Sequence, residues 1–226
     1  RYARNVVAAM DAALADTDSA VRVIAPSGTQ DPGLAAIRFR TRGPLSGHAW
    51  EQAVLPLWSH GRLLNLCNTA PAIKRDQVVC IHDANVFIRP ESYSRSFRAL
   101  YRTLQPLLVR RSARIAAVSQ ASARQIARHL PIRVEDIAVL PNGHEHALEW
   151  NPRRSTLPAE RPRIFERGFV LALGSHARHK NLKLLADIAP ALDHMGLDVI
   201  IASGGGDIFA AEDLSAAPNI LQLGRV

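Results

Sequence analysis

The chain has 226 residues, of which 47% are hydrophobic and 21% charged, a composition typical of globular proteins and too apolar for a disordered one. No apolar run approaches the roughly 18 residues that a membrane-spanning helix needs. Cys67 and Cys80 are the two cysteines, and both fall in apolar stretches. The sequence therefore excludes a disulfide framework and predicts two buried, reduced thiols, and with no signal peptide after Arg1 we expect a cytoplasmic protein.

The net charge of +8 is concentrated in one part of the chain. Between Arg89 and Arg133 there are ten arginines and one glutamate, a net charge of +9, so the remainder carries a net charge of −1. Lysine occurs at three positions in the whole chain. A lysine beside a glycine-rich turn is therefore a candidate for a specific role.

The first half of the chain alternates between helical and strand-like hydrophobic spacing. Short, fully apolar strands of this kind are typical of a parallel sheet that is covered on both faces. We expect helices over residues 2–14, 49–58, 94–111 and 119–130, and strands over residues 21–25, 63–67, 78–81, 114–118 and 137–140.

A second α/β segment follows a stretch rich in proline and arginine, which predicts a linker. We expect strands over residues 169–173, 197–202 and 219–223, and helices over residues 181–195 and shortly after residue 206. The predicted domains are residues 1–143, a linker of residues 144–167, and a partial second domain of residues 168–226. Because its last predicted strand would end the sheet at an open edge, we expect the second domain to be truncated.

The segment from Leu171 to Leu182 is the most specific candidate site. A strand runs through Gly174 into a turn with several cations and then into a helix. Glycine lets a ligand approach the backbone, and Arg178, Lys180 and the amides of a helix N-terminus all attract anions. The pattern suits a diphosphate but is neither GxxxxGK[ST] nor GxGxxG, and an ordinary strand-turn-helix connection with solvated cations stays open.

Two further candidates follow predicted strands. His82 comes directly after the strand at residues 78–81, at the end where open parallel sheets bind ligands, although a histidine that only pairs with Asp83 is an equal alternative. The glycines of residues 204–206 permit a nucleotide to approach closely, but they also make a tight turn. Both readings stay open for each candidate.

Other kinds of chemistry find little support in the sequence. The pairs His144 with His146 and His176 with His179 suggest a metal, but no further ligand completes a recognisable spacing, so we expect no metal site. A serine hydrolase is disfavoured because no GxSxG motif follows a strand.

The basic part of the chain predicts a helix with one cationic face. Arg95, Arg98 and Arg102 are spaced at i, i+3 and i+7, and apolar side chains take much of the opposite side. Such a face can lie on anionic lipids, bind an acidic partner, or simply be solvated. A nucleic-acid-binding module is the alternative from another functional class, but the few nearby aromatic residues disfavour it and we expect no nucleic-acid partner.

Several segments, taken in order, resemble the retaining GT-B glycosyltransferases of the large GT4, or group 1, family. The resemblance runs nearly from end to end. The matching segments are Arg1-Tyr2-Ala3-Arg4, which is similar to the end of the family's glycine-rich first loop; Ile81-His82-Asp83; Ala117-Val118-Ser119-Gln120-Ala121-Ser122; Val139-Leu140-Pro141-Asn142-Gly143; and Gly174-Ser175 with His179-Lys180-Asn181-Leu182.

The resemblance implies two Rossmann-like domains, an acceptor domain and a nucleotide-sugar domain, with no obligatory metal or other cofactor. It implies transfer of a hexose or N-acetylhexosamine from a UDP- or GDP-linked donor, with retention, to a glycan or lipid-linked acceptor. The implied roles by residue are His82 beside the transferred sugar, Gly174, Ser175, His179 and Lys180 at the donor, and Asn142 and Gly143 at a hinge. The local pattern of the cationic turn and the glycine loop adds Arg178, Gly204 and Gly205 to the expected donor site.

Two departures from the family pattern limit this expectation. The family's Arg-Lys pair is His179-Lys180 here, which weakens the diphosphate site unless Arg178 substitutes. The family's E-x7-E segment would lie beyond Val226, so we expect the chain alone to be inactive. A nucleotide-sugar epimerase of the same fold stays as an alternative. The resemblance implies a role in polysaccharide or lipopolysaccharide synthesis. The cationic helix face at Arg95, Arg98 and Arg102 further predicts peripheral attachment at the inner membrane.

Overall fold

The computed structural model describes residues 2–112, 114–148, 151–154, 157, 164, 166–174, 177, 180–202 and 217–224. The chain forms two compact units. The first consists of Arg1–Ala84 and Tyr101–Leu148, and the second of Asn85–Leu100 and Glu149–Val226. Helices and strands alternate, and the strand pairings in the described residues are parallel, which confirms the predicted α/β class.

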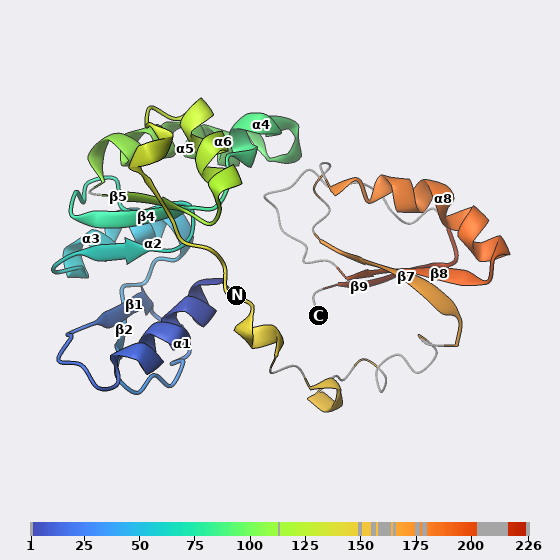
Figure 1. The fold of residues 1–226 in the computed structure, drawn as a ribbon, viewed down its shortest axis with the longest axis horizontal. Helices are drawn as coiled ribbons and strands as arrows, with labels where there is room; N and C mark the ends of the chain where they lie inside the picture. Colours follow the sequence, from blue (N-terminus) through green and yellow to red (C-terminus); the bar gives the residue numbers. More distant parts are fainter. Residues whose placement is uncertain are drawn as a thin grey trace. The chain divides into compact units, whose positions relative to one another are not determined.

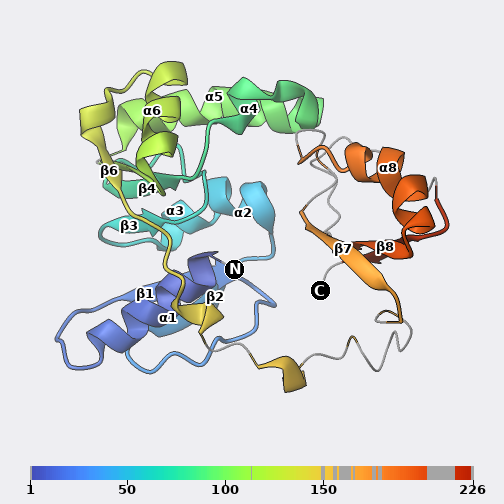
Figure 2. The ribbon, with the colours of Figure 1, turned by 45° about the vertical axis from the view of Figure 1, so that its right-hand side comes forward.

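The first unit begins with an alanine-rich helix, α1 (Tyr2–Leu14), beside the parallel strands β1 (Arg22–Pro26) and β2 (Arg38–Arg42) (Figures 1 and 2). One carboxylate joins the helix to the second strand. Asp11 accepts hydrogen bonds from the backbone N–H groups of Ala35, Ala36 and Ile37 at 2.8, 2.8 and 2.7 Å. The segment that leads into β2 is therefore fixed by a side chain of α1.

The sheet that carries most of the first unit has the strand order β3-β4-β5-β6. Its strands are β3 (Leu63–Asn65), β4 (Gln77–Ile81), β5 (Arg114–Ala117) and β6 (Ile137–Val139). β4 and β5 are central and almost wholly buried, as their apolar sequences predict. The one polar residue of β4, Gln77, is also buried, and its amide donates to the carbonyl oxygens of Pro71 and Lys74. We call this the first sheet.

Two helical segments follow β2, where the sequence predicts a helical segment near residues 49–58. The structure confirms helix in this region but divides it at Val54, so that α2 spans Gly47–Ala53 and α3 spans Leu55–Trp58. Pro56 lies in the first turn of α3, where its missing N–H costs nothing, whereas inside a continuous helix it would remove a hydrogen bond. The indole N–H of Trp50 donates to the carbonyl oxygen of Arg42 at 2.6 Å, which ties α2 to the end of β2.

Helices α5 (Arg95–Arg111) and α6 (Gln120–His129) begin close to the predicted positions. The hydroxyl of Ser119 caps α6 by accepting a hydrogen bond from the N–H of Ser122 at 3.0 Å. Helix α6 packs against β5 and β6 (Figure 1). A short helix, α4 (Asn85–Ile88), and the 3-10 turn η1 (Pro90–Ser92) occupy the predicted polar loop. Further 3-10 turns, η2 (Val134–Asp136), η3 (Glu145–Ala147) and η4 (Pro152–Arg154), lie before β6 and after it.

The second unit contains a parallel sheet in the order β7-β8-β9, with α8 (Lys183–His194) packed on β8 (Figure 1). The strands are β7 (Gly168–Leu173), β8 (Leu197–Ala202) and β9 (Ile220–Gly224). Ala186 and Ala189 of α8 pack against Val199 and Ile201 in a small core. The Asn219 amide joins the layers by donating to the carbonyl oxygens of Ala189 and Leu197 at 2.9 and 3.0 Å.

Two sequence expectations fail in the first unit. The sequence does not predict strand β2. Its five residues, Arg-Phe-Arg-Thr-Arg, contain a single large apolar side chain, which is too weak a hydrophobic pattern to indicate a strand. Cys67 was predicted to be buried in a strand, but it is exposed, since β3 ends at Asn65 and Cys67 lies in the loop that follows. Cys80 is buried in β4 as expected.

Candidate functional site

His82 lies directly after β4, at the carboxyl end of the first sheet. Because the sheet is parallel, the segments that follow β3, β5 and β6 reach the same end. We call this end the carboxyl edge of the first sheet. The half-buried ring of His82 packs edge-on against the ring of Tyr2 from α1, with the ring centroids 4.6 Å apart.

Two hydrogen bonds hold His82 in place. Its backbone N–H donates to Oδ1 of Asn68 at 2.7 Å, and its Nε2 atom lies 2.6 Å from the carbonyl oxygen of Leu66. A carbonyl oxygen can only accept a hydrogen bond, so Nε2 must carry the proton. In the neutral ring the other nitrogen, Nδ1, is then a hydrogen-bond acceptor. The contacts of His82 therefore set both its orientation and its tautomer.

Asn68 is the residue that connects these contacts. Its φ angle is +64°, in the left-handed region that asparagine tolerates better than most residues. Its N–H donates to the carbonyl oxygen of Cys80 at 2.9 Å, and its own carbonyl oxygen accepts from Gln105 of α5 at 3.3 Å. The loop after β3 is thus fastened to β4 and α5, and it presents the Asn68 side chain to His82.

Tyr2 and the two thiols lie beside this arrangement. The Tyr2 hydroxyl lies 3.9 Å from Sγ of Cys80. Burial raises the pKa of Tyr2 to about 12, and the neighbouring Cys80 thiol adds to the effect. Burial raises the pKa of the Cys80 thiol above its ordinary value. The pKa of Cys67 is also raised, because neighbouring groups partly desolvate its thiol although the residue as a whole is exposed, and because the Glu51 charge adds to the rise. These groups are therefore neutral near pH 7 and supply no nucleophile to the site.

In the second unit, the structure brings Gly174 and Lys180 together at the end of β7. A Cβ atom placed on Gly174 would lie 3.8 and 3.9 Å from Cγ and Cδ of Lys180, so the lysine stem runs beside the glycine backbone. The Gly174 N–H donates to the carbonyl oxygen of Ala202 at 3.2 Å, which anchors this turn to β8. Within the described residues the exposed Lys180 ammonium forms no ion pair, and it lies just before α8.

Other sequence-predicted donor residues lie outside the described residues. These are Ser175, Arg178, His179, Gly204 and Gly205. The predicted helix after residue 206 also falls there. The metal candidate His176 lies there too, and in the part of the chain that is described no three His, Cys, Asp or Glu side chains gather closely enough to hold a metal ion.

The predicted hinge and the cationic face are both described. Asn142 and Gly143 are exposed in the segment after β6. Arg95 and Arg102 are exposed and Arg98 is half-buried on α5, and none of the three pairs with an acid among the described residues. Across the described helices, none is both long and apolar enough to cross a membrane.

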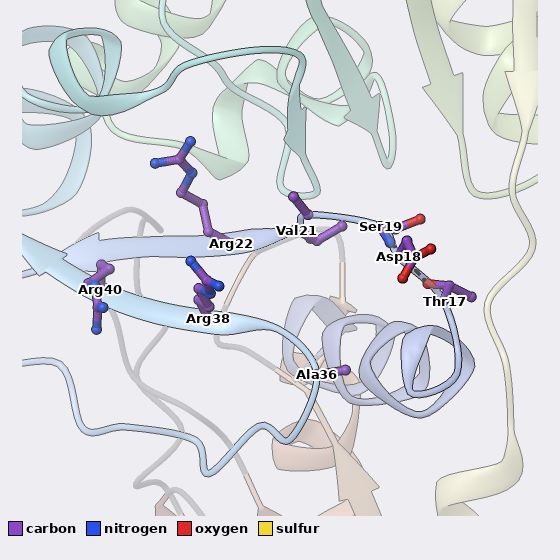
Figure 3. Close-up of a pocket in the computed structure, with 9 residues that line it drawn as sticks. Thr17, Asp18, Ser19, Val21, Arg22, Ala36, Arg38 and Arg40 are labelled. Carbon is purple, nitrogen blue, oxygen red and sulfur yellow. Dashed lines mark hydrogen bonds between the residues drawn. The ribbon is translucent and has the colours of Figure 1, made fainter.

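A cavity of about 420 Å³ lies elsewhere in the first unit, beside the β1–β2 pair (Figure 3). Arg22, Arg38 and Arg40 line it together with the turn between α1 and β1, which includes Asp18. None of the candidate residues from the sequence lines this cavity. Figure 3 shows Arg22 and Arg38 on neighbouring strands, and these two residues are register partners.

Sequence reasoning missed Asn68, Leu66 and Tyr2 as parts of the His82 site. Asn68 carries one usable signal, since asparagine is among the few residues that adopt a positive φ readily, but many turns use it in that way. Leu66 contributes only a backbone carbonyl, which has no sequence signature. Tyr2 contributes its ring. The sequence places Tyr2 on a predicted helix and in the segment that resembles the family's first loop, and neither signal points to a contact with His82.

Comparison with known proteins agrees with this architecture. The sequence model of the family described as Glycosyltransferase Family 4 matches residues 3–148, which include α1, the whole first sheet and His82. No curated protein matches the chain significantly. The family match covers well over half of the chain. The chain therefore belongs to Glycosyltransferase Family 4, with the amino-terminal domain of a group 1 glycosyltransferase of the GT-B fold.

Proposed function

We propose that this glycosyltransferase moves a hexose or N-acetylhexosamine from a UDP- or GDP-linked donor to a glycan or lipid-linked acceptor, with retention of configuration. Residues 1–143 bind the acceptor and residues 168–226 belong to the nucleotide-sugar domain, joined by residues 144–167. The reaction serves polysaccharide or lipopolysaccharide synthesis on the cytoplasmic side of the inner membrane. The observation that carries the proposal is Lys180 beside the bare backbone of Gly174 at the end of β7.

The second unit suits a diphosphate for electrostatic reasons. As the glycosidic bond stretches, negative charge develops on the departing diphosphate, and a fixed ammonium stabilises that charge more than it stabilises the ground state. Lys180 has no acid partner among the described residues that would compensate its charge. The missing side chain of Gly174 leaves room for a phosphate close to the backbone.

The first unit suits the sugar. His82 is held in one orientation by Asn68 and Leu66, and the neutral ring has its acceptor nitrogen, Nδ1, available for a hydroxyl group. In the proposal, His82 accepts a hydrogen bond from the transferred sugar and fixes its position. Its role is positioning through a neutral contact, so proton transfer by His82 is not part of the proposed reaction.

Nucleotide binding tests the diphosphate site directly. Isothermal titration with UDP and GDP compares the unsubstituted chain with Lys180→Ala and with Lys183→Ala. Lys183 is the matched control, because it lies on the same helix end but already pairs with Asp187. We expect Lys180→Ala to weaken binding by about tenfold or more, since a charged hydrogen bond contributes about 1.5–3 kcal/mol, and Lys183→Ala to change it little. Equal affinity in the parent and Lys180→Ala contradicts the proposal.

Product analysis separates transfer from epimerisation. The assay uses a full-length protein that includes the family's E-x7-E segment. With a labelled nucleotide-sugar and an acceptor extract, a transferase moves the label into a glycan of retained anomeric configuration. An epimerase instead yields an inverted free sugar or an inverted nucleotide-sugar without a glycan product. The second result overturns the proposed reaction while leaving the fold assignment intact.

We also propose that α5 attaches the protein to anionic lipid through Arg95, Arg98 and Arg102. Each arginine near an anionic membrane surface contributes about 1 kcal/mol, so replacing all three with alanine should lower vesicle binding strongly. The test is co-sedimentation with phosphatidylglycerol vesicles. The charge-matched control replaces three exposed arginines outside α5, namely Arg114 at the start of β5 and Arg124 and Arg128 on α6. Unchanged binding of the triple variant removes this part of the proposal.

A further inference from the structure

Glu51 of α2 is a half-buried carboxylate that the sequence analysis did not single out. Its side chain is 18% exposed. The Thr69 hydroxyl donates to Oε2 at 2.8 Å, and the Gln52 amide donates to Oε1 at 2.9 Å. His48 Nδ1 lies 3.7 Å from Oε1. Each carboxylate oxygen thus has one close donor.

The groups around Glu51 are buried or held by hydrogen bonds. Thr69 is 3% exposed and Tyr101 of α5 is 9% exposed. The Tyr101 ring packs edge-on against His48, with the centroids 5.6 Å apart. Gln52 is fixed at both ends of its amide, because it donates to the carbonyl oxygen of Ala70 and accepts from the N–H of Ala72, at 2.8 and 2.9 Å. We call His48, Glu51, Gln52, Thr69 and Tyr101 the Glu51 cluster.

The Glu51 cluster lies at the carboxyl edge of the first sheet, next to the His82 contacts. Thr69 directly follows Asn68, whose side chain accepts the backbone N–H of His82. Burial raises the pKa of Tyr101 to about 12, and the charges of Glu51 and of Asp83, the residue after His82, both add to this rise. The ring contact between Tyr101 and His48, whose Nδ1 atom lies 3.7 Å from Oε1 of Glu51, connects Tyr101 to the carboxylate.

The charge of the Glu51 cluster restricts the ligand. No arginine or lysine pairs with Glu51 among the described residues, and His48 is the one base within ion-pair distance there. A carboxylate accepts about four hydrogen bonds, so capacity remains on both oxygens after Thr69 and Gln52 have donated. A phosphate would be repelled, because it brings a second negative charge. A neutral ligand with neighbouring hydroxyl groups supplies the donors that are lacking.

We propose that Glu51 is a binding residue for the acceptor, accepting hydrogen bonds from two neighbouring hydroxyls of a neutral terminal sugar. This inference rests on the proposed function and adds the acceptor class to it: a polyhydroxylated sugar end, not a phosphate or a simple alcohol. Thr69 and Gln52 orient the carboxylate, while Nδ1 of His82, at the same edge of the sheet, stays with the transferred sugar.

A purely structural role for Glu51 makes a different prediction. The same hydrogen bonds also fasten α2 to the loop after β3, and a fastening residue would affect folding without affecting sugar binding. Glu51→Gln keeps the size of the side chain but removes its charge and one of its acceptor oxygens. Thr69→Val removes one orienting hydrogen bond and keeps the shape. Glu135→Gln, on the exposed turn η2 before β6, is the control for loss of one carboxylate.

The probes are methyl α-mannoside, methyl α-glucoside, cyclohexanol and inorganic phosphate, with binding to the full chain followed by saturation-transfer difference NMR. Thermal unfolding of each variant is recorded beside it. We expect the chain to bind at least one methyl hexoside in preference to cyclohexanol and phosphate. Glu51→Gln should weaken that binding by about tenfold, equivalent to about 1.4 kcal/mol, Thr69→Val by less, and Glu135→Gln should leave it unchanged.

Three results overturn the inference: no hexoside binding by the unsubstituted chain, equal binding by Glu51→Gln and the parent, or stronger binding of phosphate than of sugar. If Glu51→Gln fails to fold, Thr69→Val becomes the test variant. The inference then requires Thr69→Val to bind the sugar more weakly than the parent while its unfolding temperature stays close to that of the parent. Nucleotide binding at Lys180 is measured separately. Its failure would contradict the proposed donor site and leave the hexoside result to stand by itself.

Discussion

The carboxyl edge of the first sheet and the end of β7 in the second unit differ in how their polar side chains are held. At the first, polar side chains are mutually hydrogen-bonded, and His82 and Glu51 each have their orientation fixed by at least two neighbours. At the second, a glycine backbone lies beside a lysine whose ammonium has no acid partner among the described residues. Under the proposed function, the first region would recognise shape and hydroxyl groups, whereas the second would recognise charge.

The largest effect that this comparison predicts is on turnover through His82. His82→Ala removes the acceptor nitrogen and the ring that Tyr2 packs against. In a full-length protein that includes the family's E-x7-E segment, we expect turnover of the nucleotide-sugar to fall by about 10- to 100-fold, because one buried hydrogen bond contributes about 1–3 kcal/mol, while UDP and GDP affinity stays the same. Steady-state kinetics and nucleotide titration on the same preparation check this prediction. If turnover and nucleotide affinity fell by the same factor, His82 would not act on the sugar separately from the nucleotide site, contrary to the proposal.

Alkaline pH should weaken the first unit through Tyr101. Burial raises the pKa of its hydroxyl from 10.0 to about 12, so the folded state keeps the proton that the unfolded state loses between these values. The stabilisation is complete below pH 10 and is lost as the pH rises toward 12, on the order of 2 kcal/mol. Urea unfolding at about pH 8 and pH 11 measures the loss. Tyr101→Phe should show a smaller alkaline loss than the parent, and an identical loss would argue against this origin.

Asn68 should be sensitive to two different changes. Asn68→Ala keeps the β-carbon at a φ of +64° but loses the short polar side chain that lets asparagine adopt this conformation more easily than alanine. It also removes the acceptor for the His82 N–H, so we expect a loss of about 1–2 kcal/mol in stability. Asn68→Gly relieves the backbone but still removes the acceptor. It should therefore be the more stable of the two while turnover stays low in both. Chemical denaturation and kinetics together check the pair, and a fully active Asn68→Gly would remove Asn68 from the site.

The smallest predicted effect concerns salt. Nucleotide binding at the exposed Lys180 should weaken a few-fold between about 0.05 and 0.5 M NaCl, because screening shortens the reach of surface charges. Hexoside binding at Glu51 should not change over the same range, because the ligand is neutral. Titrations in both salts check this, and a parallel loss for the two ligands would show that charge governs both regions.

The sequence predicted the elements that bury apolar runs. Strands β4 and β5 and helix α6 with its Ser119 cap could be located because their hydrophobic spacing and capping residue are local signals. Strand β2 was missed because it holds three arginines in five residues, so its pairing with β1 depends on the partner strand more than on its own composition. The break at Val54 could not be located, because the sequence alone does not show whether Pro56 lies in the first turn of a new helix or inside a continuous one.

The candidate site was only partly predictable. His82, Gly174 and Lys180 follow strands, and that position is visible in the sequence. Glu51 was not visible, because a single glutamate on an amphipathic helix is most often solvated, and its meaning depends on Thr69 and Tyr101, which are 18 and 50 residues away in the sequence. Asn68 and Leu66 act through a loop conformation that only tertiary structure defines.

The carboxylate of Asp11 makes local unfolding of the first unit depend on pH. Three backbone amides hold its pKa below the ordinary value, so this support is complete above the ordinary carboxyl pKa and is lost as the pH falls through the lowered one. Protonation would release Ala35, Ala36 and Ile37 from α1 while the first sheet, which has no such carboxylate anchor in its described strands, keeps its core. In an acid titration the β1–β2 ribbon should therefore be the first part of the unit to admit solvent and proteases.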